Sequence, residues 1–185
     1  MQLNIYIVSH PIIKILSNSI IENNKITNIS IYNEKYLGFL LIYELMRKYI
    51  KINSIYIKKI NYVKKIYIKN HNKQHYIITN LIETYKIIGE ITSLLPDIKI
   101  ININTKQNIQ QIENLQNITF NTEIIIFDKI LKSSWILQII RHLIRKRKIC
   151  IENIQIVCLA CYNQILDKLG NEYPKLEIYT AKIIY

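Results

Sequence analysis

From residue 76 onward, runs of apolar β-forming residues alternate with segments of helical periodicity. The runs that predict strands are 76–79, 98–103, 123–127, 154–160 and 176–180. The segments that predict helices are 81–95, 134–148 and 163–169. This alternation predicts an α/β fold with a mostly parallel sheet and helices on both faces. Ligands of such sheets bind at the carboxyl ends of the strands.

The first part of the chain follows a different pattern. Residues 4–8 predict a short strand, and 11–21 and 33–49 predict an N-terminal helical segment. Residues 52–69 alternate apolar and basic, which predicts the strands of a β-hairpin with one face in water. The polar stretch 70–74 is the expected hairpin turn. Without a linker or an internal repeat, we expect residues 1–185 to form a single domain.

The chain is strongly basic, with 25 Lys and Arg against 13 Asp and Glu and a formal net charge of +12. Such a field favours anionic partners, namely nucleic acid, an acidic protein face or anionic lipid. The abundance of Ile, Asn, Lys and Tyr, the residues of AT-rich codons, offers genome bias as a second explanation. Only 3 glycines are present, so glycine-rich ligand loops are excluded.

The opening residues Met1–Val8 lack the basic region and cleavage site of a secretory signal. The most apolar stretch, Tyr36–Met46, is too short to span a membrane and contains Glu44. We therefore expect no transmembrane segment. The AT-rich composition favours a protein made in a plastid, located in the chloroplast stroma or peripheral to the thylakoid.

Cys158 and Cys161 have the C-x-x-C spacing of some zinc sites. Two further ligands at matching spacing are lacking, and His142 and Cys150 lie on what the pattern predicts to be a helix and its end. Cys158 falls inside an apolar run typical of a buried strand, where cysteine acts as a small core residue. We expect no metal and no cofactor.

Six segments together carry a family resemblance. They are Ser9–Ile13 (S-H-P-I-I), Leu41–Arg47 (L-I-Y-E-L-M-R), Leu94–Asp97 (L-L-P-D), Ile124–Leu131 (I-I-I-F-D-K-I-L), Gln155–Ala160 (Q-I-V-C-L-A) and Leu176–Ala181 (L-E-I-Y-T-A). In order and spacing they resemble the uracil phosphoribosyltransferase family over residues 5–181. The resemblance implies a phosphoribosyltransferase-like α/β fold and, as in that family, the option of a homodimer.

The resemblance places a phosphate loop after Asp128, a carboxylate that in the family holds ribose hydroxyls. Family members carry Thr-Gly-Gly-Ser in this loop, whose amides and hydroxyls hold a 5′-phosphate. The matching positions here are Ser133, Ser134, Trp135 and Ile136. Serine and tryptophan replace both glycines, and we expect the indole of Trp135 to fill the space of the phosphate. Lys132 is a compensating cation that cannot replace a set of backbone amides.

Two further family elements are altered. Where the family has Arg-Ala-Gly to grip pyrophosphate, this chain has Ile82, Glu83 and Thr84, so an arginine is replaced and a carboxylate is added. The family also continues into a glycine-rich segment that recognises uracil, whereas this sequence stops at Tyr185. These departures from the family pattern lead us to expect a degenerate, C-terminally truncated homologue.

A basic cluster occupies the predicted helix at 134–148 and its end. Its members are Arg141, Arg145, Lys146, Arg147 and Lys148. This cluster is either an anion-binding patch for RNA or an acidic protein, or the solvated end of a helix. Tyrosines interleaved with lysines at 62–69 are similarly open to base stacking or to a half-buried sheet.

The leading expectation is a catalytically inactive uracil-phosphoribosyltransferase-like protein acting as a binding or structural subunit. Its partners would be proteins of a larger complex, such as a photosynthetic assembly of the plastid. One alternative is an active enzyme that makes UMP from uracil and phosphoribosyl pyrophosphate in pyrimidine salvage. Another is a basic RNA-binding module, which would show steep salt dependence.

Overall fold

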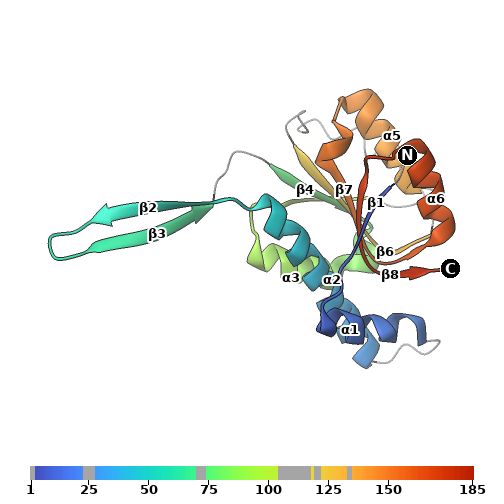
Figure 1. Cartoon of the computed structure of the whole chain (residues 1–185), viewed down its shortest axis with the longest axis horizontal. Helices are drawn as coiled ribbons and strands as arrows, with labels where there is room; N and C mark the ends of the chain where they lie inside the picture. Colours follow the sequence, from blue (N-terminus) through green and yellow to red (C-terminus); the bar gives the residue numbers. More distant parts are fainter. Residues whose placement is uncertain (1–2, 23–27, 70–73, 104–117, 119–121, 133–134) are drawn as a thin grey trace.

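The computed structural model describes residues 3–22, 28–69, 74–103, 118, 122–132 and 135–185. Within these residues the chain forms a six-stranded sheet, helices on both of its faces, and a separate two-stranded hairpin (Figure 1). The polar stretch 104–117 lies outside the described residues.

The six strands of the main sheet lie in the spatial order β1-β8-β7-β6-β4-β5. Their bounds are β1 Asn4–Ile7, β4 His75–Thr79, β5 Lys99–Asn102, β6 Glu123–Leu131, β7 Ile154–Tyr162 and β8 Glu177–Ile184. Every pairing in this sheet is parallel, which confirms the predicted sheet type. β1 pairs with β8, with Asn4 opposite Glu177, so the first strand of the chain lies beside the last.

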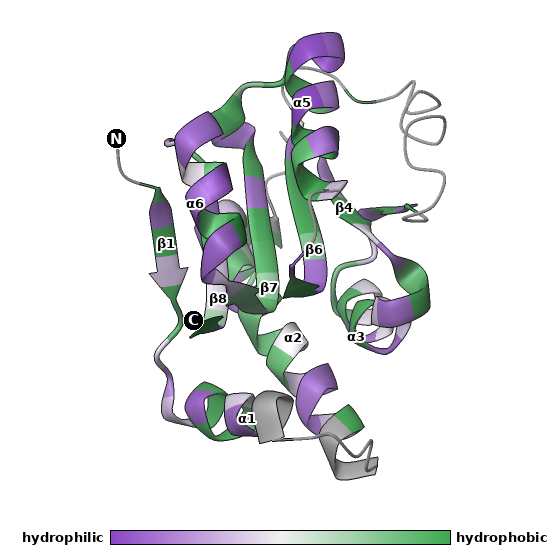
Figure 2. Cartoon of the chain, turned by 90° about the vertical axis from the view of Figure 1, so that its right-hand side faces the viewer, coloured by the Kyte–Doolittle hydropathy of each residue, from purple (hydrophilic) through white to green (hydrophobic). Residues whose placement is uncertain are grey.

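The helices divide between the two faces of the sheet (Figures 1 and 2). On one face lie α5 (Trp135–Arg147) and α6 (Asn163–Glu172), with a short 3-10 helix at Ile151–Asn153 before β7. On the other face lie α1 (Pro11–Glu22), α2 (Asn28–Tyr49) and α3 (Leu81–Leu94). Each helix layer buries its own apolar core against the sheet.

The strand sequences explain why both faces are covered. Successive side chains of a strand point to opposite faces, and in β6 both sets are apolar. Ile124 and Ile126 pack in the core under α5 and α6, whereas Ile125 and Phe127 pack in the core under α2 and α3. A strand that is apolar on both sides is stable only when both sides are covered.

The helices α2 and α3 approach each other closely at Gly38. A Cβ atom at this position would lie 2.7 Å from Cγ2 of Ile87 on α3, which is buried. The absence of a side chain at Gly38 therefore permits the contact. Lys35 and Glu90 add an ion pair at 2.6 Å between the same two helices.

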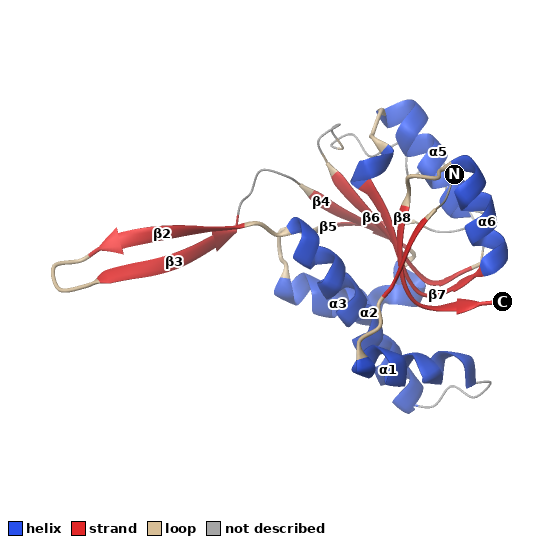
Figure 3. Cartoon of the chain, viewed as in Figure 1, coloured by secondary structure: helices blue, strands red, loops and turns tan. Residues whose placement is uncertain are grey.

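The predicted β-hairpin is present as β2 (Ile52–Lys58) and β3 (Val63–Lys69), which pair antiparallel (Figure 3). The predicted position of its turn is wrong. The turn lies at 59–62, where the Lys59 N–H donates to the Tyr62 carbonyl at 2.8 Å. Residues 70–73 lie outside the described part of the chain, and β4, which follows, belongs to the main sheet. The turn is missed because Lys-Ile-Asn-Tyr carries neither Gly nor Pro.

The prediction that the hairpin keeps one face in water is also wrong, since both faces are exposed. Every residue of β2 is exposed. β2 and β3 pair only with each other among the described strands, and the hairpin projects from the body of the molecule (Figure 1). Alternation in the sequence identified two chemically different faces, but a covering layer is a tertiary property that alternation cannot supply.

Several element bounds differ from those predicted. α2 begins at Asn28 rather than 33, and β8 runs to Ile184 rather than 180 because its pairing with β7 continues to Tyr162 opposite Ile184. Pairing with a neighbour thus extends a strand beyond its local apolar run. Among the described helices, none is both long enough and apolar enough to cross a membrane.

Candidate functional site

The main sheet has a point where the direction of its connections reverses. From β4 the chain moves outward through α3 to β5, and it then returns to β6 on the opposite side of β4. Such a switch point opens a crevice at the carboxyl ends of the strands, where ligands of α/β sheets bind. Thr79 ends β4 opposite Phe127 of β6, so Asp128 and Asn80 follow at this crevice.

Asp128 is buried in this position, with 7% of its surface exposed. Its carboxylate accepts hydrogen bonds from the backbone N–H groups of Lys129 and Ile130 and from the side chain of Trp135. Burial, followed by the charge of Glu83, raises the pKa of Asp128 to about 6, against the lowering effect of these hydrogen bonds. The carboxylate is therefore already bonded within its own chain.

Trp135 is the first residue of α5 and is buried in the core beneath that helix. Since an indole has a single N–H donor, the bond to Asp128 uses its whole hydrogen-bonding capacity. This contact ties the start of α5 to the end of β6. That the indole fills the phosphate position stays a prediction. Ser133 and Ser134 lie outside the described residues, and Lys132 is exposed.

The N-terminus of α3, the second predicted phosphate element, has its amides occupied by its own chain. The Leu81 N–H donates to Oδ1 of Asn102 at 3.0 Å, and the Ile82 N–H donates to Oδ1 of Asn80 at 3.2 Å. The next two amides, of Glu83 and Thr84, donate to the Asn80 carbonyl at 3.2 and 3.1 Å. The amides of Leu81, Ile82 and Glu83 are three of the four donors that a helix start otherwise offers to an anion, whereas the Thr84 amide makes the first ordinary bond within the helix.

The three residues at the altered Arg-Ala-Gly position point in different directions. Ile82 is 72% exposed and has no polar atom in its side chain to offer. Glu83 accepts a hydrogen bond from Nδ2 of Asn80 at 3.2 Å. Thr84 is buried, and its hydroxyl lies 2.9 Å from that of Thr79 and 2.8 Å from the Asn80 carbonyl. The position thus presents one carboxylate and no cation of its own.

Sequence reasoning missed the asparagines that organise this region. Asn80 caps α3 and Asn102, at the end of β5, reaches its first amide. The cap was visible in the sequence, because an Asn directly before a helical segment, with Glu three residues later, is a helix-start pattern. The role of Asn102 was not visible, since it depends on β5 lying beside β4.

The structure divides the predicted basic cluster. Arg141 forms a two-pronged ion pair with Glu172 of α6, at 3.0 and 2.6 Å, and this pairing raises the pKa of Arg141. Arg145 and Lys146 are exposed in the last turn of α5, and Arg147 is half-buried. Lys148 follows with a left-handed φ of 54°, which ends the helix. One of the five cations is thereby committed to holding α5 and α6 together.

Two surface grooves lie elsewhere. A groove of about 580 Å³ runs between β1, α1 and α2, and it includes Tyr6 stacked on Tyr179 with ring centroids 4.8 Å apart. An apolar groove of about 360 Å³ lies between α2 and α3, near the base of the hairpin. Cys158 is buried in the core, as predicted, and Cys161 is buried there as well.

The parallel sheet, its two helix layers and the carboxylate at its switch point define an α/β protein of the phosphoribosyltransferase type. The structure is similar to that of the AQ2163 protein from Aquifex aeolicus, with a TM-score of 0.70 and 17% sequence identity. The similarity covers 97% of this chain and 86% of that one.

Sequence comparison identifies the family. The family model for uracil phosphoribosyltransferase matches residues 7–184. Two relatives from red algae, each named "Uracil phosphoribosyltransferase homolog", are 32% (Porphyra purpurea) and 33% (Pyropia yezoensis) identical to this chain over 184 residues. Each alignment covers 99% of this chain and 89% of the relative. The chain belongs to the uracil phosphoribosyltransferase family.

Proposed function

We propose that this family member has lost the synthesis of UMP and serves as a binding or structural subunit. The observation that carries the proposal is the occupied state of the switch-point crevice. The amides of Leu81, Ile82 and Glu83 at the start of α3 and the carboxylate of Asp128 all bond within the chain. Groups that would hold a phosphoribosyl substrate are therefore engaged in holding the fold.

Electrostatics adds support to this proposal. A pyrophosphate needs amide donors and positive potential, whereas Glu83 and Asp128 place two carboxylates close enough for one to raise the pKa of the other. A like-charge pair 4 Å apart at an effective dielectric of 20 costs about 4 kcal/mol. An anionic substrate entering this crevice would meet repulsion in addition to the occupied donors.

The proposed setting is a plastid. The composition typical of AT-rich codons and the two red algal relatives support it. In that setting the chain would be a peripheral subunit of a larger protein assembly, such as a photosynthetic one. The net charge of +12 suits a partner surface rich in acidic residues.

The direct test is an assay for UMP. The purified chain is mixed with uracil and phosphoribosyl pyrophosphate, beside an active uracil phosphoribosyltransferase as positive control. We expect no UMP above background, and no heat of binding when phosphoribosyl pyrophosphate is titrated into the chain by calorimetry. UMP formation at a rate that Asp128→Asn abolishes would instead establish the active-enzyme alternative.

The subunit role is tested separately by affinity purification from the native organelle. We expect the chain to migrate with a larger complex at fixed stoichiometry when the extract is sized. If it migrates only as a small particle, the subunit proposal fails, whatever the outcome of the UMP assay.

A further inference from the structure

The hairpin of β2 and β3 has two faces of different chemistry. Directly opposed residues of an antiparallel pair share a face, and the register pairs Tyr56 with Lys65 and Ile55 with Ile66. One face, which we call the Lys–Tyr face, carries Tyr56, Lys58, Lys65 and Tyr67, together with Ile52, Ser54, Val63 and Lys69. The opposite face, which we call the Ile face, comprises Ile55, Ile57, Ile66 and Ile68.

On the Lys–Tyr face, cations and rings are interleaved in space as well as in sequence. Nζ of Lys65 lies 5.0 Å from the ring centroid of Tyr67 and 5.6 Å from that of Tyr56. Toward the turn, Nζ of Lys59 lies 5.4 Å from the ring of Tyr62. Tyr56 and Tyr67 are 63% and 66% exposed as residues, so both side chains can be reached by a ligand.

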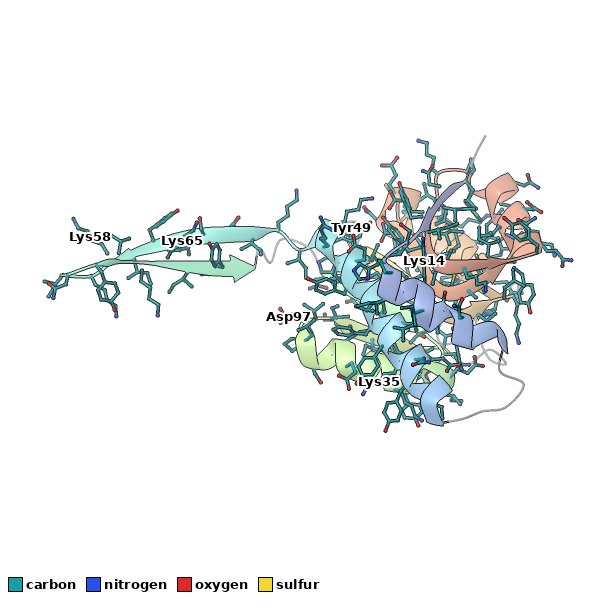
Figure 4. All side chains as sticks on the ribbon, turned by 60° about the horizontal axis from the view of Figure 1, so that its bottom comes forward. Lys14, Lys35, Tyr49, Lys58, Lys65 and Asp97 are labelled. Carbon is teal, nitrogen blue, oxygen red and sulfur yellow. The ribbon has the colours of Figure 1, made fainter. Side chains whose placement is uncertain are left out.

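The charge of this region is unbalanced. Between Glu44 and Glu83 the sequence contains nine lysines and arginines and no acidic residue. Among the described residues, no carboxylate forms an ion pair with Lys58, Lys59 or Lys65. Figure 4 shows Lys58 and Lys65 far out on the hairpin, away from the main sheet. Arg47 and Lys48 of α2 form ion pairs with Glu44 and Glu177, whereas the positive charge of Lys58, Lys59 and Lys65 is held on a projecting surface without such a pair.

We infer that the Lys–Tyr face of the hairpin binds single-stranded RNA. Its lysines would contact backbone phosphates, and its tyrosines would stack on bases, which is how single strands are held without sequence preference. RNA commonly presents unstacked bases in loops and ends, where aromatic side chains bind them. The seven residues of β2 span roughly 20 Å, enough for a short run of nucleotides.

The face chemistry favours RNA over an acidic protein. Lysines alone would be enough to bind an acidic protein, whereas on this face Lys65 lies beside the exposed Tyr56 and Tyr67. The inference does not depend on the loss of UMP synthesis, because the hairpin is separate from the sheet that carries Asp128. Failure of one proposal therefore leaves the other standing.

The test is fluorescence anisotropy of a labelled oligouridylate of about ten nucleotides, within the usual site size for a single strand. Full-length chain is titrated at several salt concentrations. We expect binding that weakens steeply with salt, as phosphate contacts require. Tyr67→Ala should weaken it about tenfold, the typical loss of one base stack, and Tyr67→Phe should retain it.

Two neighbouring lysines provide a matched control. Lys65→Gln and Lys64→Gln remove the same charge from adjacent residues, but Lys64 lies on the side of the Ile face, opposite Ile57. We expect Lys65→Gln to weaken binding several-fold and to lower the salt slope by about 0.7, with a smaller loss for Lys64→Gln. Circular dichroism of both variants should match the parent chain, because both residues are exposed.

Three results would overturn the inference. One is no salt-sensitive binding of the oligouridylate at low salt. Another is an equal effect of Lys64→Gln and Lys65→Gln, which would mean that general charge, not this face, attracts RNA. The third is competition by polyglutamate as effective as that by unlabelled oligouridylate, which would assign the face to an acidic protein.

Discussion

The folded environment of Asp128 disfavours the charged form of its carboxylate. Its pKa rises from an ordinary 3.8 to about 6, chiefly through burial. A carboxyl whose pKa is higher in the folded protein binds more protons there, so the stability of the fold decreases as pH rises from about 4 through about 6. At neutral pH the charged carboxylate thus lowers the stability of the chain.

This predicts a stabilising substitution at the switch point. Asp128→Asn should raise the free energy of unfolding at pH 7.5 by up to about 3 kcal/mol, since each pKa unit corresponds to about 1.4 kcal/mol. The gain should shrink as pH falls and approach zero below about pH 3, where Asp128 is protonated in both states. Urea unfolding at several pH values measures it, with exposed Asp167→Asn as control; an equal gain at every pH would contradict the explanation.

At the scale of single residues, the sequence showed which residues depart from the family pattern, but it did not show which contacts they make. That Ile82 and Glu83 stand where the family resemblance leads us to expect Arg-Ala was visible directly. That the indole of Trp135 would bond to Asp128 depends on how the chain turns from β6 into α5. That Asn102 would reach the first amide of α3 depends on β5 lying beside β4. The family resemblance indicated where to look for a ligand site. Only the fold could show that backbone N–H groups there already bond within the chain.

At the scale of elements, substitution by alanine is expected to have opposite effects at the glycines of α2 and α3. A Cβ added at Gly38 would lie 2.7 Å from Cγ2 of Ile87, whereas a Cβ added at Gly89 would meet nothing within 4 Å. Gly89→Ala should stabilise the chain by about 0.5–1 kcal/mol through its unfolded state. Gly38→Ala should destabilise it by about 1–3 kcal/mol, because a buried methyl must displace Ile87.

Thermal unfolding of both variants, under identical conditions, measures the difference. The two substitutions add the same methyl group to a helix, so propensity cancels and packing alone separates them. Equal stabilisation of both variants would contradict the close packing of α2 against α3, in which an added Cβ at Gly38 would lie 2.7 Å from Cγ2 of Ile87.

The hairpin shows how much of the secondary structure could be predicted from the sequence. Alternation at 52–69 identified its strands and the chemistry of its faces. The turn was misplaced because no glycine or proline marks it. The parallel sheet was predictable from the order of its runs, since long apolar strands separated by helices leave few alternatives.

For the molecule as a whole, the Ile face predicts self-association. Ile55, Ile57 and Ile68 are 47%, 43% and 41% exposed, which is costly on a projecting hairpin. The family resemblance allows a dimer, and we expect one that buries these side chains. Ile57→Ser combined with Ile68→Ser should weaken it at least about tenfold, given about 1 kcal/mol for each half-exposed isoleucine.

Sedimentation at several concentrations measures this association. Ser54→Thr, on the other side of β2, is the matched control and should leave the dissociation constant unchanged. A chain that sediments as a monomer at every concentration would rule out the dimer while leaving the RNA inference untouched, because that inference concerns the Lys–Tyr face.

The pairing of β1 with β8 sets the order in which the molecule can be completed during synthesis. β1 leaves the ribosome first, yet its only partner among the described strands is β8, made near the end of the chain. Until β8 is made, β1 has no strand to pair with in the sheet, and Tyr6 and Ile7, which are exposed in the folded chain, have no neighbouring strand. Such distant pairing slows folding and leaves the nascent chain dependent on protection from aggregation.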